Sequence, residues 1–440
     1  MAAGPLVRPY RIRWNGFVKR LHPAWLVAAV AFVALVGAAG FRATPGVLIH
    51  PLHDEFGWSL GTISLAVSIN LLLFGLTAPF AAALMERFGI RRVVAYALLL
   101  VSAGSGLTVF MKHSWELIAL WGVLVGLGTG SMALAFVATI TGRWFVHRRG
   151  LITGVLTAGG AAGQLVFLPL LALLTDAHGW RAAALTVAGA ALAVVPLVMW
   201  RLRDHPSELG VAPYGGEFVE APVATGGAAR RALGALRTAS RKPAFWLLAG
   251  GFAICGATTN GLIGTHFIPA AHDHGMTEPT AASLLALIGL FDIAGTIASG
   301  WLTDRMDSRV LLGWYYALRG LSLLVLPMLF AATVRPSMLV FILFYGLDWV
   351  ATVPPTVALC REYFGASGPV VFGWVFASHQ FGAAIAATAT GLLRDRLGNY
   401  DLAWYIAGGL SISAAALSLL LFRTRNASTA ATPSVAAVAA

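Results

Sequence analysis

The sequence predicts an all-α polytopic membrane protein with twelve transmembrane helices in two six-helix halves. Of its 440 residues, 58% are hydrophobic and only 11% are charged, whereas a soluble domain carries about 25% charged residues. Apolar runs near 20 residues recur along the chain, and each is long enough to cross a hydrocarbon core of roughly 30 Å. Such continuous runs favour helices over the short alternating strands of a membrane β-barrel.

The apolar runs give the order of the predicted spans. They cover approximately residues 24–49, 59–84, 91–111, 115–140, 150–174, 181–200, 244–270, 280–303, 309–331, 337–359, 369–393 and 401–422. If the first span starts in the cytoplasm, cytoplasmic segments hold 23 of the 30 Lys and Arg residues. This bias predicts that both termini are cytoplasmic. The net charge of +12 therefore reports topology, and we expect no nucleic-acid partner.

Composition divides the chain into four predicted parts. Residues 1–200 form the N-terminal half, 201–243 a cytoplasmic loop, 244–422 the C-terminal half and 423–440 a tail that we expect to be disordered. The basic residues 1–23 lack a cleavage site and are interpreted as a cytoplasmic lead-in. From about Arg230 the loop is either a short basic amphipathic helix at the membrane surface or a soluble linker.

One motif follows both the second and the eighth span. AALMERFGIRR occupies 82–92 and GWLTDRMDSR occupies 300–309, which indicates a parallel internal repeat. The chain here resembles the major facilitator superfamily, whose loop reads G-x-L-A-D-R-x-G-R-K. The resemblance implies a latch between the halves, and an anchor for helix ends in the headgroups is the alternative. The predicted gating residues are Glu86, Arg87, Arg92, Asp304, Arg305 and Arg309.

Three further stretches resemble one branch of that superfamily, the monocarboxylate transporters and oxalate/formate antiporters with their bacterial members. They are PGVLIHPLHDEFGWS at 45–59, GRWFVHRRGLITGVLTAGGAAGQ at 142–164, and the eighth span with Asp292. The eukaryotic members place a Lys in the outer part of span one, and an Asp followed one turn later by an Arg in span eight. Arg42 falls near the first position and Asp292 on the second, but Thr296 stands where the Arg is expected.

Asp292 is a carboxylate deep in an apolar span. It precedes Asp304 by 12 residues, which places it about 18 Å from the inner membrane edge along a helix. An acid at that depth costs at least ~2.5 kcal/mol and usually faces a cavity or a partner. We therefore predict that Asp292 faces the interior and accepts a proton, while Arg42 is the counter-charge of a substrate carboxylate.

Arg319 and Asp348 are the two other charged residues clearly within spans. They are a candidate buried ion pair; alternatively, Arg319 replaces the Arg that Thr296 displaces. Three uncharged polar residues, Asn260, His379 and Gln380, complete the predicted substrate-binding set, although packing between helices is an alternative role for each. His379 is the one whose side chain titrates near neutral pH.

These observations favour a secondary transporter of a small organic anion, with proton coupling as an added hypothesis. Export of an amphipathic compound on the same fold is the alternative, suggested by Thr296 and the aromatic-rich second half. The sequence lacks the GxxxxGK[ST] motif that would indicate ATP-driven pumping. It also lacks a catalytic constellation that would indicate an enzyme.

The remaining expectations concern partners and location. We expect a monomer in contact with lipid in the inner (plasma) membrane, with a small molecule as partner and no cofactor. The spacing of the external histidines matches no familiar zinc framework, so no metal site is predicted.

Overall fold

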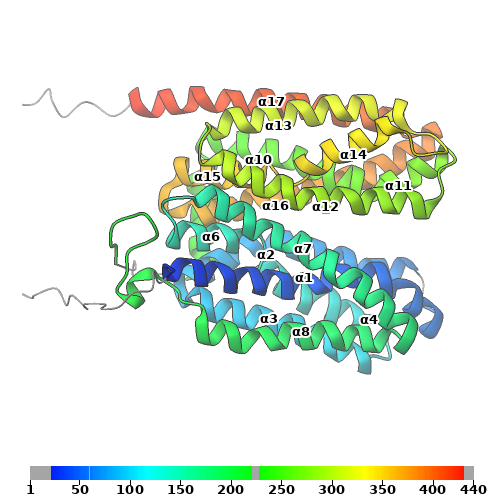
Figure 1. Cartoon of the computed structure of the whole chain (residues 1–440), viewed down its shortest axis with the longest axis horizontal. Helices are drawn as coiled ribbons and strands as arrows, with labels where there is room; N and C mark the ends of the chain where they lie inside the picture. Colours follow the sequence, from blue (N-terminus) through cyan, green and yellow to red (C-terminus); the bar gives the residue numbers. More distant parts are fainter. Residues whose placement is uncertain (1–20, 59, 221–226, 431–440) are drawn as a thin grey trace, which may run out of the picture.

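The computed structural model describes residues 21–58, 60–220 and 227–430, most of which form helices. Two groups of helices lie alongside each other, α1 to α8 and α10 to α17 (Figure 1). The first group consists of α1 (Pro23–Phe56), α2 (Leu60–Phe88), α3 (Ile90–Leu107), η1 (Thr108–Phe110), α4 (Ser114–Leu117), η2 (Ile118–Val125), α5 (Gly126–Ser131), α6 (Leu134–Trp144), α7 (Arg149–His178) and α8 (Trp180–Arg201).

The second group repeats this arrangement after the loop. It consists of α10 (Pro243–Gly256), η4 (Ala257–Ile263), α11 (Gly264–Asp273), α12 (Glu278–Thr303), α13 (Ser308–Val325), η5 (Leu326–Leu329), α14 (Pro336–Asp348), α15 (Val353–Phe364), η6 (Gly365–Ser367), α16 (Gly368–Leu397) and α17 (Asp401–Ala430). The loop itself contains η3 (Pro206–Leu209) and α9 (Ala228–Ala239).

The all-α membrane fold is confirmed. Within the described residues, 11 stretches are long and apolar enough to cross a membrane. One of them, Pro336–Arg394, has 59 residues and covers both the tenth and the eleventh predicted spans. The count of twelve crossings and the cytoplasmic position of the termini stay predictions.

The loop is fastened to both halves at one end of the bundle, called here the linker end, where α2 and α12 finish and α7 and α16 begin. Near its start, Asp204 accepts a hydrogen bond from the backbone N–H of Arg91, 2.7 Å away. Gly89 permits this approach, because its φ is +89° and a Cβ there would lie 2.0 Å from the Asp204 carboxylate. The linker therefore caps the start of α3.

Helix α9 corresponds to the short helix that was one of the two alternatives predicted for the loop. It packs against α2 of the first half and α16 of the second. Arg231 on α9 forms an ion pair with Glu86 on α2, 2.9 Å apart, and Trp374 on α16 donates to the carbonyl of Ala232, 3.0 Å away. Helix α9 thus connects both halves at the linker end.

Two spans that the sequence predicted as continuous are broken. The fourth is interrupted at Met132 and Ala133, between α5 and α6, and the tenth at residues 349–352, between α14 and α15. Pro354 and Pro355 explain the second break, because proline has no N–H for the helix interior and is tolerated in the first turn of α15. The breaks occupy matching positions in the two halves, as a parallel repeat predicts.

The two halves meet where α7 packs against α12 and where α2 packs against α16. Glycines allow the backbones to approach: a Cβ on Gly300 of α12 would lie 2.3 Å from the carbonyl oxygen of Gly150 on α7. Similarly, a Cβ on Gly154 would lie 2.4 Å from the carbonyl oxygen of Thr296. Small residues therefore set this contact.

Candidate functional site

A cavity of about 750 Å³ lies between the two halves. Both helix breaks contribute to its wall, Met132 and Ala133 from the fourth span and Trp349, Val350 and Thr352 from the tenth. Discontinuous helices at the interface of two repeats are a recurring construction of transport sites, since they expose backbone polar groups to a cavity. This cavity is therefore the candidate substrate site.

Asp292 lies in the cavity wall and is 4% exposed. Its Oδ1 accepts hydrogen bonds from the Thr296 hydroxyl at 2.8 Å and from the backbone N–H of Val350 at 3.1 Å. The Val350 N–H belongs to the broken segment, where the regular helix pattern cannot satisfy every backbone group. Asp292 is the one carboxylate among the described lining residues, and its hydrogen-bond donors are both neutral.

Arg319 and Asp348 contact each other behind this wall. Arg319 Nε donates to Asp348 Oδ2 at 2.6 Å, and Nη2 donates to the Asp348 carbonyl at 2.7 Å. A third donor, Nη1, reaches Cys255 Sγ at 3.0 Å. The guanidinium thus also satisfies the carbonyl end of α14 at the break. Neither Arg319 nor Asp348 belongs to the described cavity lining.

The three predicted uncharged residues, Asn260, His379 and Gln380, all line the cavity. His379 is stacked on Phe376, with ring centroids 5.9 Å apart and an interplanar angle of 18°. Gln380 packs against Gly75 of the opposite half, where a Cβ would lie 2.8 Å from its Cγ. These positions let the three residues contact a bound solute.

Arg42 belongs to α1, but its side chain lies outside the described part of the structure. Several polar residues of the wall, Thr352 among them, escaped the sequence-based prediction, and so did the backbone N–H of Val350. The pair Pro354–Pro355 is the signal that could have placed a break just before it.

The predicted gating residues differ in their contacts. Asp304 lies at the end of α12 and bridges to the other half, since its carboxylate accepts from the backbone N–H groups of Gly150 at 2.7 Å and Leu151 at 3.0 Å. An acid at the start of a helix is favourable because the N–H groups there lack helical partners. Asp304 therefore joins α12 to α7 at the linker end.

Of the other five gating residues, one contacts the loop, three contact residues of their own half and one is exposed. Glu86 pairs with Arg231 of α9. Arg305 stacks on Trp301, with its guanidinium carbon 3.9 Å from the ring centroid. Arg87 lies over the ring of Phe88, and Arg92 is exposed at the start of α3. Arg309 forms ion pairs with Asp307 and with Glu362 of α15.

Comparison with known proteins identifies the family. The sequence profile described as Major Facilitator Superfamily matches residues 30–368 and 253–439. The MFS-type transporter YcxA of Bacillus subtilis is 27% identical over 385 residues, which cover 86% of this chain and 90% of that protein. Monocarboxylate transporter 11 of Homo sapiens is 27% identical, covering 88% of this chain and 81% of that protein. These relatives confirm the resemblance to the monocarboxylate transporters.

Solved structures agree on the fold. The E. coli fucose:proton symporter FucP superposes with a TM-score of 0.69 at 14% identity, covering 91% of this chain and 99% of that one. The proton:xylose symporter XylE gives a TM-score of 0.66, also at 14% identity, covering 91% of this chain and 95% of that one. The family profile and the relatives confirm the prediction of a transporter rather than an enzyme: the chain belongs to the major facilitator superfamily of membrane transporters.

Proposed function

We propose that the protein moves a small, monocarboxylate-like organic anion across the membrane by alternating access, with a proton carried on Asp292. The observation that carries the proposal is the cavity between the halves with Asp292 buried in its wall. The names of its relatives, several of which are monocarboxylate transporters, support the substrate class.

The substrate carboxylate needs a positive partner. The described cavity lining contains no Lys or Arg, so we assign this role to Arg42. Ala38 and Ala39 of α1 line the cavity, and a position three or four residues further along a helix shares the same face. Asn260, His379 and Gln380 supply hydrogen bonds to the rest of the solute.

The proton is assigned to Asp292 because of its partners. Asp348 has the Arg319 guanidinium beside it, whereas Asp292 has a hydroxyl and a backbone N–H. A buried charge without a counter-ion is costly, and protonation removes that cost. A substrate anion that engages Arg42 and a proton on Asp292 would then cross together with little net charge in the low-dielectric interior.

The gating residues act on the linker end in this proposal. The Asp304 contact with α7 and the glycine contacts between α7 and α12 hold the halves together there. The cavity wall extends the other way, to Val67 near the start of α2 and Thr388 in the second half of α16. Release of the Asp304 contact would let the halves rock and expose the cavity at the linker end.

The test is proton flux into liposomes that contain the purified protein and an internal pH dye. Gradients of lactate, pyruvate, other short monocarboxylates and oxalate are imposed in turn. We expect acidification with at least one acid and its loss in Asp292→Asn. Asp176→Asn, at an exposed position of α7, is the matched control and should behave as the unmodified protein. Acid-driven flux that Asp292→Asn leaves unchanged would remove Asp292 from the mechanism.

A second candidate function is export of an amphipathic compound. Two features of the cavity wall favour it: the described lining contains no Lys or Arg, and it is rich in aromatic side chains. The aromatic residues are Phe41, Phe74, Phe252, Trp349, Phe376 and Phe381. Absence of acid-driven flux, together with saturable binding of an amphipathic dye that Phe376→Ala weakens, would favour this function. For either function we propose a monomer in the inner (plasma) membrane, surrounded by lipid.

A further inference from the structure

A second pocket, of about 490 Å³, lies between the halves at the linker end. Its wall is built from α6 and α7 of the first half and from α12, α15 and α16 of the second. It shares no lining residue with the central cavity. The pocket is therefore a separate space that exists only while the two halves are in contact at this end.

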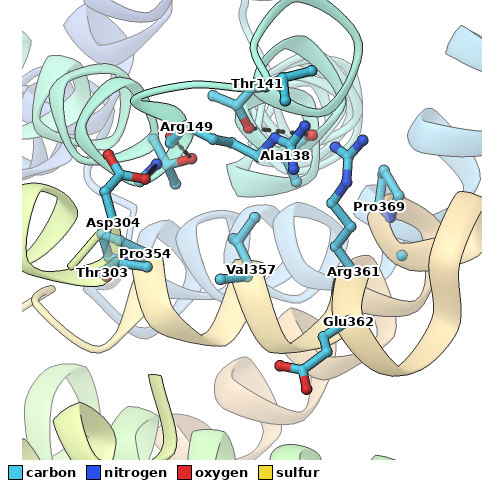
Figure 2. Close-up of a pocket in the computed structure, with 15 residues that line it drawn as sticks. Ala138, Thr141, Arg149, Thr303, Asp304, Pro354, Val357, Arg361, Glu362 and Pro369 are labelled. Atoms are coloured by element: carbon cyan, nitrogen blue, oxygen red, sulfur yellow. Dashed lines mark hydrogen bonds between the residues drawn. The ribbon is translucent and has the colours of Figure 1, made fainter. Parts of the chain in front are cut away.

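Two arginines from opposite halves reach into this pocket. Figure 2 shows the guanidinium groups of Arg149, from α7, and Arg361, from α15, entering the same space. Arg149 Nε donates to the Phe145 carbonyl at 2.7 Å, and Arg361 Nη1 donates across the seam to the Gly142 carbonyl at 2.8 Å. Each guanidinium keeps further N–H donors, and the two positive charges repel each other.

Two acids, Asp304 and Glu362, also line this pocket, and each carboxylate has other direct partners. Asp304 accepts from the backbone N–H groups of Gly150 and Leu151. Glu362 forms an ion pair with Arg309, and in Figure 2 its carboxylate points away from Arg361. Among the described residues neither Arg149 nor Arg361 forms a salt bridge. The pocket thus holds two positive charges that no protein carboxylate neutralises by direct contact in these residues.

The start of α16 adds to the positive character of the pocket. Gly368 and Pro369, at this start, line it, and the N-cap residue Ser367 makes no side-chain capping bond. In the other half the start of α7 receives the carboxylate of Asp304. Glu86 is the repeat counterpart of Asp304, but it pairs with Arg231 of α9. The helix start and both arginines therefore favour an anion in the same place.

We propose that this pocket binds an oxyanion, a phosphate or carboxylate group, between Arg149 and Arg361. The planar guanidinium matches such groups with paired N–H donors, and an anion between the two arginines removes their repulsion. Because the arginines come from different halves, a bound oxyanion stabilises the conformation that is closed at the linker end. The source of the oxyanion is either a free anion or the headgroup of an anionic lipid, and the proposal holds whichever solute the central cavity carries.

The test titrates the purified full-length protein in neutral detergent with inorganic phosphate, at constant ionic strength kept with chloride. We expect a saturable rise in the thermal unfolding temperature. Arg149→Gln and Arg361→Gln should each weaken the apparent affinity for phosphate about tenfold or more, since each removes hydrogen bonds between charged groups. Arg241→Gln, at an exposed position between α9 and α10, is the matched control and should not change it.

A second arm separates the two sources. In nanodiscs without phosphate, phosphatidylglycerol should raise the unfolding temperature above that in phosphatidylcholine if the headgroup fills the pocket, and this difference should vanish in Arg361→Gln. If free anions fill it, phosphate should act equally in both lipids.

Should the glutamine variants fail to fold, Arg149→Lys and Arg361→Lys keep the charge but lose the paired donors, and should still weaken phosphate binding.

Hydrogen exchange provides an independent readout. Phosphate should slow exchange of the amides of residues 150, 151 and 304–306, which surround the seam at the linker end. Asp292→Asn should keep the phosphate effect, so a failure of the transport proposal leaves this one intact. The proposal is overturned if neither phosphate nor phosphatidylglycerol has an effect. It is also overturned if the Arg149 and Arg361 variants respond as strongly as the unmodified protein.

Discussion

The carboxylate of Asp304, at the end of α12, accepts a hydrogen bond from the backbone N–H of Gly150, in the first turn of α7, at 2.7 Å. The two residues are 154 positions apart and belong to opposite halves of the transporter. The bond satisfies an N–H group that α7 itself leaves without a partner, and it places a negative charge at the positive end of that helix. It is one of the contacts that join α12 to α7 at the linker end, together with the close glycine contacts between these helices.

Asp304→Asn should loosen this closure. An amide accepts hydrogen bonds more weakly than a carboxylate, and bonds to charged groups contribute about 1.5–3 kcal/mol. We expect amide hydrogens of Gly150 and Leu151 to exchange about tenfold faster or more. Hydrogen–deuterium exchange with mass spectrometry would measure this. Asp307→Asn is the control, since Asp307 bonds Arg309 within its own half; equal protection in wild type and Asp304→Asn would exclude the latch.

Gly300→Ala should destabilise the contact between α7 and α12. The added Cβ would lie 2.3 Å from the Gly150 carbonyl oxygen, so one backbone has to move, at a cost of about 1–3 kcal/mol. Gly289→Ala on the same helix meets nothing within 4 Å and should be neutral or slightly stabilising, because alanine favours helix. Thermal unfolding in detergent compares the two, and equal unfolding temperatures would show that the seam tolerates the extra atom.

Arg319→Met should be strongly destabilising. It leaves the buried Asp348 carboxylate without its 2.6 Å partner, and breaking a buried pair in this way costs about 3–5 kcal/mol. Arg319→Met combined with Asp348→Asn should recover part of the loss, since no buried charge is then left without a partner. Unfolding of both single variants and of the double variant completes the cycle. A double variant no more stable than Arg319→Met would mean that the guanidinium acts mainly on the carbonyls of the helix break.

Glu55 gives the fold an acid-sensitive contact outside the membrane-spanning part of α1. Hydrogen bonds from Arg181 at 2.6 Å and from the Trp180 indole at 2.6 Å lower the pKa of Glu55. A carboxyl group whose pKa is lower in the folded protein than in the unfolded protein stabilises the fold at pH values above its unfolded-state pKa. This contribution to stability is lost as the pH falls through the folded-state pKa.

Arg181→Gln should therefore reduce stability at neutral pH by a small amount and flatten its decline in acid. The pair is largely exposed, so salt should weaken it as well. Unfolding temperatures between neutral and strongly acidic pH measure both effects. Parallel pH profiles for the variant and the unmodified protein would show that this pair does not contribute.

The sequence alone was enough to predict the membrane fold. Long apolar runs can satisfy their backbone groups only as helices in lipid, so their number and length indicate the architecture without any tertiary information. The duplicated motif with Glu86 and Asp304 indicated the repeat, and the cost of burying a charge indicated that Asp292 faces the interior. Each of these inferences depends on local chemistry and on the bilayer as solvent.

The tertiary structure decided which groups meet. Hydrophobicity does not distinguish a continuous helix from a broken one, so the contacts of the tenth-span break with Asp292 and Arg319 appear only when the helices are packed. Both copies of the motif carry an acid, yet Asp304 reaches α7 whereas Glu86 is held by α9. The presence of Arg149 and Arg361 in the wall of one pocket likewise depends on the contact between the halves. Such contacts join positions far apart in the chain, and no local pattern in the sequence specifies them.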